Sequence, residues 1–417
     1  MRLSFTGVQK AHCRTSINQK KQENMKNLVL SALSVLFSLG CMAADREIPV
    51  GRTVDITGVE RIEAYSSVKV HYTQGSGSTV LVKENGTANS EVTVNGKTLC
   101  IKLPALEKSP AGVSRSVGGR VVVVGNNSYD VRTEVFVTLP ALRVVRNSGS
   151  LNFEAERPID TAGGTLTLEN SGSMQASFSA INDSNGSRID LHNSGSLRIG
   201  MDRTAVNEFT MNNSGSLTAE MKSLAADGRV GLHNSGSLRL ALPEVTASRF
   251  ECGNNGSIHV GNMTVKSSVF KYSNSGSDSE QTLMRVVSGD CSISNFGVMN
   301  RSFEVGRGAG DNSARLDFTS KGVAKGSLKF TGGTATMDID GVCRTDIVVD
   351  CSVLNLTASE GSKVSVSGHA ANFAYNGSEK SLKTSSLKYG SLTKKRGKNS
   401  DVLWQNNGEG EVNQFNP

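Results

Sequence analysis

The chain has 417 residues, including 44 Gly but only 7 Pro, and its aromatic share is 5%. The formal net charge is +7, yet six of the cations and a single acid precede Asp45, which leaves 39 Lys and Arg against 37 Asp and Glu. The chain from Asp45 onward is therefore nearly neutral and has no positive potential that could hold nucleic acid, so that class of partner is excluded. Abundant Gly, Thr, Val and Ser favour short strands and tight turns over helices.

The first 44 residues have the pattern of a leader. Lys26 and the apolar run 28–39, followed by small residues, are typical of a secretory signal peptide over 25–44, with translation starting at Met25. Residues 1–24 are then an upstream artefact of start-site choice. Cys41 closes a Ser-Leu-Gly-Cys box that resembles a bacterial lipoprotein cleavage site, while plain cleavage after Ala43 or Ala44 is the alternative. Either route predicts an exported protein of the cell envelope, and only the lipoprotein route gives it a membrane contact, through a lipid on Cys41.

Residues 45–145 form the predicted strand-rich start of the fold. Two strands joined by an Asn-Gly hairpin are expected over 92–101, and a further alternating strand over 134–139. The stretch 107–119, with Pro110 and several Ser and Gly, has the composition of a mobile loop.

From residue 146 to 300 a single motif recurs. The tetrapeptide Asn-Ser-Gly-Ser, or a close variant, returns every 20 to 23 residues, flanked by alternating apolar residues. Such a period indicates one strand-turn-strand unit stacked many times. We therefore predict an all-β fold, a right-handed parallel β-helix (β-solenoid) in which each repeat is one rung. The Asn and Gly of the motif form the predicted turn ladder: Asn147, Gly149, Asn170, Gly172, Asn193, Gly195, Asn213, Gly215, Asn234, Gly236, Asn254, Gly256, Asn274, Gly276, Asn295 and Gly297.

The composition of the tetrapeptide suggests how a corner is built. Gly permits a positive φ at no steric cost, and Asn side chains stacked on successive rungs bond to one another along the axis. On this interpretation Gly215→Val costs several kcal/mol, because a β-branched residue is strained at positive φ.

The motif decays after residue 300. Gly322, Gly341, Gly361 and Gly377 are the third residues of related tetrapeptides, so 301–392 are expected to form degenerate rungs or a second, divergent copy. The Lys-rich residues 393–417 are expected to form a disordered tail.

Cysteines lack the spacing of a metal site or a disulfide framework. Cys252 and Cys291 occupy inward positions and are expected to behave as small core hydrophobes. Pairing of Cys343 with Cys351 across one turn stays open.

No catalytic, cofactor-binding or metal-binding residues emerge. Asp338 and Asp340 alternate on one strand, which is more typical of a solvated face than of a cation site. His192 and His233 are expected two rungs apart, about 10 Å, because Asn212 lies on the rung between them. His71, His259 and His369 have no Cys or His partner at ligand spacing. We therefore predict a protein that is not an enzyme and needs no cofactor.

The sequence predicts a long outward surface without catalytic groups. Arg198, Thr218, Arg239 and His259 are predicted to align on the outward side, giving a polar face suited to extended carbohydrate or a surface protein. An ordinary solvated sheet face is the alternative for each of these residues. The oligomeric state is not indicated.

Several segments resemble the bacterial putative auto-transporter adhesin family with the head GIN domain, common in Bacteroidetes envelopes. The resemblance rests on 54–62, the 94–101 hairpin, Val-Phe-Val-Thr-Leu-Pro-Ala-Leu at 135–142 and the Ser-Gly-Ser turns that follow, and covers about 50–300. It implies a right-handed β-helix shaped like the pectin lyases but without their catalytic residues, and a role in adhesion. An exported, non-enzymatic β-solenoid for adhesion or envelope structure is thus the main hypothesis. A polysaccharide lyase or hydrolase and a periplasmic scaffold without an external ligand are the alternatives.

Overall fold

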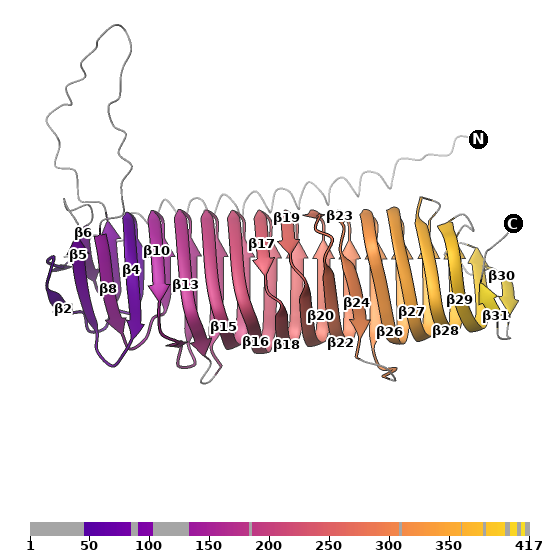
Figure 1. Ribbon diagram of the computed structural model, residues 1–417, viewed down its shortest axis with the longest axis horizontal. Coiled ribbons are helices and arrows are strands. Elements are labelled where there is room, and N and C mark those ends of the chain that lie inside the picture. The colour runs from indigo at the N-terminus through magenta and orange to yellow at the C-terminus, as the bar shows by residue number, and fades with distance from the viewer. Residues whose placement is uncertain are drawn as a thin grey trace, which may run out of the picture.

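The computed structural model is a rod in which strands run across the long axis and stack along it (Figure 1). It describes residues 46–84, 91–102, 133–182, 186–307, 311–359, 361–377, 381–396, 401–406 and 410–412. The parallel coils form a β-solenoid of about 12 turns, as the repeat predicts. The predicted leader, with Cys41, and the loop 107–119 lie outside the described residues. In the described part of the chain, no helix is long and apolar enough to cross a membrane.

Each regular rung has three short faces, which β15 (Ser196–Asn213) and β16 (Ser216–Asn234) show well. The two strands pair in parallel over three blocks, with the register shifting between Val206 and Glu208. We call the block after the tetrapeptide face B (216–221 in β16), the next face C (223–226) and the block before the following tetrapeptide face A (229–234). Each face joins a continuous parallel sheet along the rod.

The remaining strands differ in length and, toward the two ends of the rod, some of them also differ in pairing direction. Those of the first part are β1 (Arg46–Glu47), β2 (Thr53–Asp55), β3 (Arg61–Ala64), β4 (Ser67–Gln74), β5 (Thr79–Glu84), β6 (Glu91–Asn95), β7 (Thr98–Lys102) and β8 (Thr133–Leu139). Those of the regular array are β9 (Val144–Asn147), β10 (Ser150–Ala155), β11 (Ile159–Asp160), β12 (Thr165–Asn170), β13 (Ser173–Asn182), β14 (Arg188–Asn193), β17 (Ser237–Ala241), β18 (Glu244–Asn254), β19 (Ser257–Val260), β20 (Met263–Asn274), β21 (Ser277–Asp278), β22 (Leu283–Asn295), β23 (Val298–Met299) and β24 (Ser302–Gly306). Those of the last part are β25 (Arg315–Ser320), β26 (Val323–Ile339), β27 (Val342–Ala358), β28 (Lys363–Gly377), β29 (Leu382–Arg396), β30 (Asp401–Asn406) and β31 (Gly410–Val412).

The order of rungs is reversed once at the N-terminal end. Strand β4 pairs in parallel with both β8 and β10, and β3 pairs with both β7 and β9. The rung built from 61–74 therefore lies between the later strands β7 and β8 on one side and the rung 144–155 on the other (Figure 1). The predicted hairpin is present, since β6 and β7 pair antiparallel with Asn95 opposite Thr98.

Antiparallel strands cover both ends of the parallel stack. At the N-terminal end β5 pairs antiparallel with β8, and β2 pairs antiparallel with β5. At the other end β30 and β31 pair antiparallel with β29. The expectation of a disordered tail from residue 393 is therefore wrong for 393–396, which belong to β29, and for 401–406 and 410–412, because the open edge of β29 offers backbone groups for these segments to pair with.

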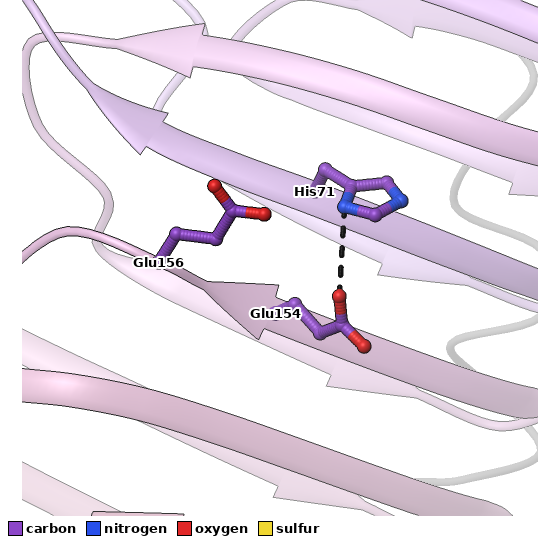
Figure 2. Close-up of side chains that lie close together, drawn as sticks. All are labelled: His71, Glu154 and Glu156. Atoms are coloured by element: carbon purple, nitrogen blue, oxygen red, sulfur yellow. Dashed lines mark ion pairs between the residues drawn. The ribbon is translucent and has the colours of Figure 1, made fainter. Parts of the chain in front are cut away.

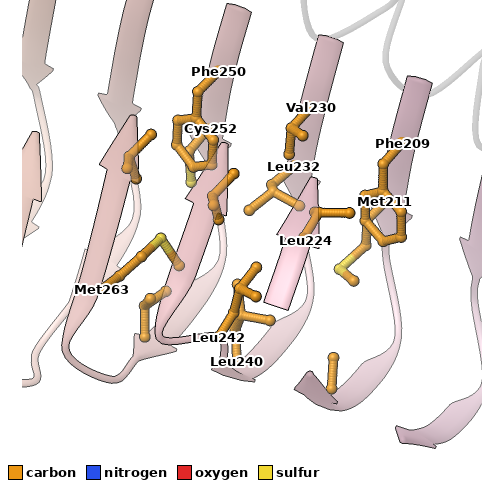
Figure 3. Close-up of a cluster of buried hydrophobic side chains, with 14 of the residues drawn as sticks. Phe209, Met211, Leu224, Val230, Leu232, Leu240, Leu242, Phe250, Cys252 and Met263 are labelled. Carbon is orange, nitrogen blue, oxygen red and sulfur yellow. The ribbon is translucent and has the colours of Figure 1, made fainter. Parts of the chain in front are cut away.

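Apolar side chains at alternating positions fill the interior of the rod as one continuous core. Figure 3 shows Phe209, Val230 and Phe250 on successive rungs of face A, with Cys252 at an inward position beside them. Cys252 and Cys291 are buried as expected, and burial raises the pKa of Cys252 to about 12. The five described cysteines are free, so Cys343 and Cys351 do not pair.

The eight Asn of the tetrapeptides form a buried column along the rod. Each of the first seven donates its side-chain amide to the carbonyl Oδ1 of the next, at 2.7–2.9 Å. All eight are 0–3% exposed. The same amide also donates to a backbone carbonyl of the next rung, as Asn193 does to Ser216 at 2.9 Å. Every buried polar group is thereby paired within the column, which satisfies the requirement for burying amides.

The glycines are required for a reason other than the predicted one. None of the eight ladder glycines has a positive φ, so the predicted left-handed corner is wrong. Instead, a Cβ built on Gly215 would lie 2.1 Å from the carbonyl oxygen of Gly195 on the preceding rung. The backbones of successive corners approach so closely that only a residue without a side chain fits. Close stacking, and not backbone conformation, explains the glycine column.

The glycine column continues into the C-terminal rungs but ends before the predicted positions do. A Cβ on Gly322 or Gly341 would again lie within 2.3 Å of the preceding corner's carbonyl oxygen. Gly377, in contrast, is in register with Ala358 and thus occupies the position of the Asn column. Ala358 stands at the first corner position of its rung, so the third position is residue 360, and Gly361 comes one residue after it. Two of the four degenerate motifs therefore do not mark corners of the regular type.

Candidate functional site

The predicted turn ladder cannot itself contact a partner, because its Asn side chains are buried within the rod. Function must therefore reside on outward positions. Register places Arg198, Thr218, Arg239 and His259 in one outward row on face B, as the sequence analysis expected. Gln175 precedes Arg198 in the same row.

A groove of about 750 Å³ runs along face B beside this row. Its lining comes from β10, β13, β15, β16, β17 and β19, so it follows the long axis across successive rungs. Five rung spacings of about 4.8 Å give it a length of roughly 25 Å. The groove therefore has the dimensions of a segment of extended polymer.

Small residues form the floor of this groove. The outward row next to the Arg198 row contains Ser177, Gly200, Glu220 and Ala241, and its three small members leave space where longer side chains would stand. A Cβ on Gly200 would meet no atom within 4 Å, so the space above it is open. The aromatic ring that lines the groove, Phe178, is 3% exposed and belongs to the core.

Charged side chains form the walls, and some pair between rungs. Lys222 Nζ lies 2.8 Å from Asp202 Oδ2, and Arg198 Nη2 lies 2.9 Å from Glu220 Oε1. These ion pairs are well exposed, and pairs of that kind contribute about 0–1 kcal/mol to stability. Their side chains are accordingly available to rearrange around a bound partner.

A His–carboxylate cluster lies at the N-terminal end of the groove. His71 of β4 is in register with Glu154 of β10, and Glu156 follows Glu154 on the same side of the strand (Figure 2). One potential ligand atom from each of the three lies within 4.8 Å of the others. His71 Nδ1 is 3.6 Å from Glu154 Oε2, and Lys69 Nζ lies 3.0 Å from the same oxygen. Glu156 also lines the groove.

Strand β8 supports the other side of His71. The ring stacks on Phe136, with the centroids 4.5 Å apart and an angle of 5° between the planes. His71 Nε2 is buried without a hydrogen-bond partner, and the nearest carboxylate, Glu134 Oε2, is 3.8 Å away. Sequence reasoning missed this cluster because its residues come from β4 and from the end of β10, about eighty residues apart in the chain, which the strand order brings side by side.

The other candidates considered in the sequence are not brought into such a group. Asn212 lies between His192 and His233 in the strand register, as expected. Asp338 is in register with Thr319, and Asp340 follows the end of β26. His369 lies 3.9 Å from Asp350 on an exposed face. Across the described ranges, His71, Glu154 and Glu156 form the one group with metal-ligand proximity.

A buried ion pair interrupts the apolar core further along the rod. Asp278 occupies the inward position that Ile258 fills on the preceding rung. Arg301 donates to both carboxylate oxygens of Asp278, at 2.7 and 2.9 Å, and Tyr272 donates its hydroxyl to the same group. Burial opposes the charge of Arg301, but hydrogen bonding to Asp278 raises its pKa above the usual value. Both charged side chains are inaccessible to solvent, so this pair has a structural place and no contact with the groove.

Fold and groove together define a rod protein built from stacked rungs, with an extended polar surface. The family model for the putative auto-transporter adhesin, head GIN domain, matches residues 59–277, so the chain belongs to this family. Rungs beyond residue 277 extend the same parallel stack past the matched region.

Solved structures with partial similarity come from Bacteroides and Parabacteroides species. A putative adhesin from Bacteroides fragilis NCTC 9343 is 13% identical, with 73% of this chain and 95% of that chain covered and a TM-score of 0.21. A putative adhesin from Parabacteroides distasonis ATCC 8503 is 13% identical, with coverages of 83% and 93% and a TM-score of 0.22. A putative lipid binding protein from the same organism is 13% identical, with coverages of 82% and 95% and a TM-score of 0.18. None of the curated proteins compared with the chain matches it.

Proposed function

We propose that the protein is an exported, non-enzymatic adhesin-type rod that binds extended carbohydrate or a surface protein along the face B groove. The observation that carries the proposal is the groove itself, which continues across successive rungs over Ser177, Gly200 and Ala241, with charged side chains such as Glu220 and Lys222 along it. Membership of a family described as adhesins supports the same role. The leader at 25–44 supports export, and its two candidate processing routes are lipidation of Cys41 and plain cleavage after Ala43 or Ala44.

Filling the groove tests this proposal. Ala241→Trp and Gly200→Trp place a large ring on the groove floor, and Gly200 has open space above it. Ala225→Trp is the matched control, because Ala225 is likewise an exposed alanine but lies on face C. Binding of the full chain is measured on arrays of oligosaccharides and of immobilised bacterial surface proteins.

We expect the two groove variants to lose binding at least tenfold while Ala225→Trp binds like the wild type. A signal confined to one type of array identifies the partner class. Equal binding by all variants would remove the groove from the proposal. New reducing ends or unsaturated uronates in the bound carbohydrate would establish the lyase or hydrolase alternative instead.

The anchor has a separate test. Fatty-acid labelling of the protein in the producing bacterium should mark the wild type and not Cys41→Ser. Label on neither protein would mean that cleavage occurs after Ala43 or Ala44 and that the rod carries no lipid at Cys41.

A further inference from the structure

We propose that His71, Glu154 and Glu156 bind one divalent transition-metal ion, with Zn²⁺ as the probe, at the N-terminal end of the face B groove. This site goes beyond the proposed adhesin role and does not depend on it. The argument rests on the ligand atoms, on the group that orients the imidazole and on the position of the cluster in the rod.

The ligand set suits such an ion. One imidazole nitrogen and two carboxylate oxygens are ligands that Zn²⁺ accepts at 2.0–2.2 Å, which places ligand atoms roughly 3.5 Å apart around a tetrahedral ion. The three groups here lie within 4.8 Å of one another. Glu156 is exposed, so a rotamer change that moves its carboxylate by about 1 Å closes the set.

The imidazole is held in the orientation that a metal ligand needs. Nδ1 faces Glu154 (Figure 2). Nε2 lies 3.8 Å from the carboxylate of Glu134. A histidine that binds a metal through one nitrogen commonly donates its other N–H to a carboxylate, which fixes the tautomer and raises ligand basicity. Stacking on Phe136 fixes the ring plane. When Nδ1 binds the metal, the neutral ring carries its proton on the buried Nε2, and that N–H points toward Glu134.

Charges around the cluster agree with a cation there. Three carboxylates surround His71, from Glu134, Glu154 and Glu156; of the cations around them, Lys69 lies beside Glu154, and Lys83 lies 4.5 Å from the centroid of the Phe136 ring. A carboxylate has several lone-pair directions, so Glu154 can contact Lys69 and a metal ion together. The alternative occupant of the cluster is a proton: a doubly protonated His71 would pair with Glu134 and Glu154 without any metal.

Three protein ligands leave at least one coordination position open to solvent or to a ligand. Glu156 is shared with the groove lining, so that position lies at the groove's end. The site thereby offers an anchor for an anionic group of whatever occupies the groove.

The test uses the full chain without a polyhistidine tag. Isothermal titration with Zn²⁺ should show one saturable site, and Co²⁺ should give weak d–d absorption without the intense near-ultraviolet band of a thiolate ligand. The described cysteines are buried, so they do not compete in the folded protein.

Variants assign the site. His71→Gln and Glu156→Gln should each weaken binding by more than tenfold, and Glu134→Gln by about 10- to 100-fold, the range for residues that orient a ligand. His259→Gln and Glu220→Gln, on the same face, should bind like the wild type.

Three results would overturn the proposal: no saturable Zn²⁺ binding at pH 7.5, unchanged affinity in His71→Gln, or a thiolate band with Co²⁺. A different result would assign the cluster to protonated His71 instead: His71→Gln lowers the melting temperature, and Zn²⁺ leaves the melting temperature of the wild type unchanged. Groove binding that persists in His71→Gln leaves the adhesin role intact, so the two proposals fail separately.

Discussion

Replacing a ladder glycine tests the reason for its presence. A Cβ on residue 215 would lie 2.1 Å from the carbonyl oxygen of Gly195 and 2.6 Å from the carbonyl of Ser194. Relief requires the corner to open by about 1 Å, which disrupts the hydrogen bonds from Ser216 N to Gly195 O at 2.9 Å and from Ser214 N to Asn193 O at 2.8 Å. Each buried group left without a partner costs about 1–3 kcal/mol. We therefore expect Gly215→Ala to destabilise the rod by about 3 kcal/mol, and Gly215→Val by more.

Gly215→Asn separates the two explanations. Asn tolerates positive φ, so a left-handed corner would accept it with little loss. Close stacking predicts that Asn is as harmful as Ala, since both carry a Cβ. Gly96 is the matched control, because its φ is +54° and a Cβ there meets nothing within 4 Å. Gly96→Asn should be nearly neutral.

The assay is urea unfolding of the full chain, combined with hydrogen exchange of peptides from residues 193–217. Faster exchange at this corner in Gly215→Ala and Gly215→Asn, with no change in Gly96→Asn, is the expected pattern. An Asn variant as stable as the wild type, beside a destabilised Ala variant, would refute the stacking explanation.

Three further outcomes follow from buried groups. Arg301→Met should lower the free energy of unfolding in urea by about 3–5 kcal/mol, because it leaves Asp278 buried and unpaired. Adding Asp278→Leu to this variant should restore most of the lost stability. Equal stability of the single and double variants would contradict this. Asn234→Leu should cost about 2–4 kcal/mol by calorimetry, since it interrupts the amide column on both sides, and an unchanged melting temperature would count against the column. Burial raises the pKa of Cys252 and of Cys351 to about 12. Iodoacetamide at pH 8 should therefore alkylate neither thiol until the protein is unfolded, which mass spectrometry can measure. Rapid labelling of either cysteine in the native state would show that the core opens there.

The repeating part of the fold was predictable because its information is local. A spacing of 20 to 23 residues and alternating apolar positions specify rungs, their register and their inward faces. The outward alignment of Arg198 with Thr218 and Arg239 followed directly. Composition alone could not separate the two roles of glycine, since a left-handed turn and a close backbone contact select the same residue.

Features that depend on long-range pairing were not predictable in the same way. Nothing in residues 61–74 shows that β4 lies between β8 and β10, and the surroundings of His71 depend on that strand order. The buried pair did leave a signal: Asp278 stands where earlier rungs have Leu or Ile, and a buried acid requires a cation such as Arg301.

The reversed first rung has a consequence for how the chain is made. Synthesis proceeds from the N-terminus, yet β4 acquires neighbours on its two sides only after β8 and β10 have emerged. Within the segment 61–74, β3 and β4 gain their first parallel partners when β7 and β8 emerge, and their other side stays uncovered until β9 and β10 follow, about eighty residues after Gln74. Later rungs each dock on a finished predecessor, which makes the rod grow in one direction from a start that is completed late.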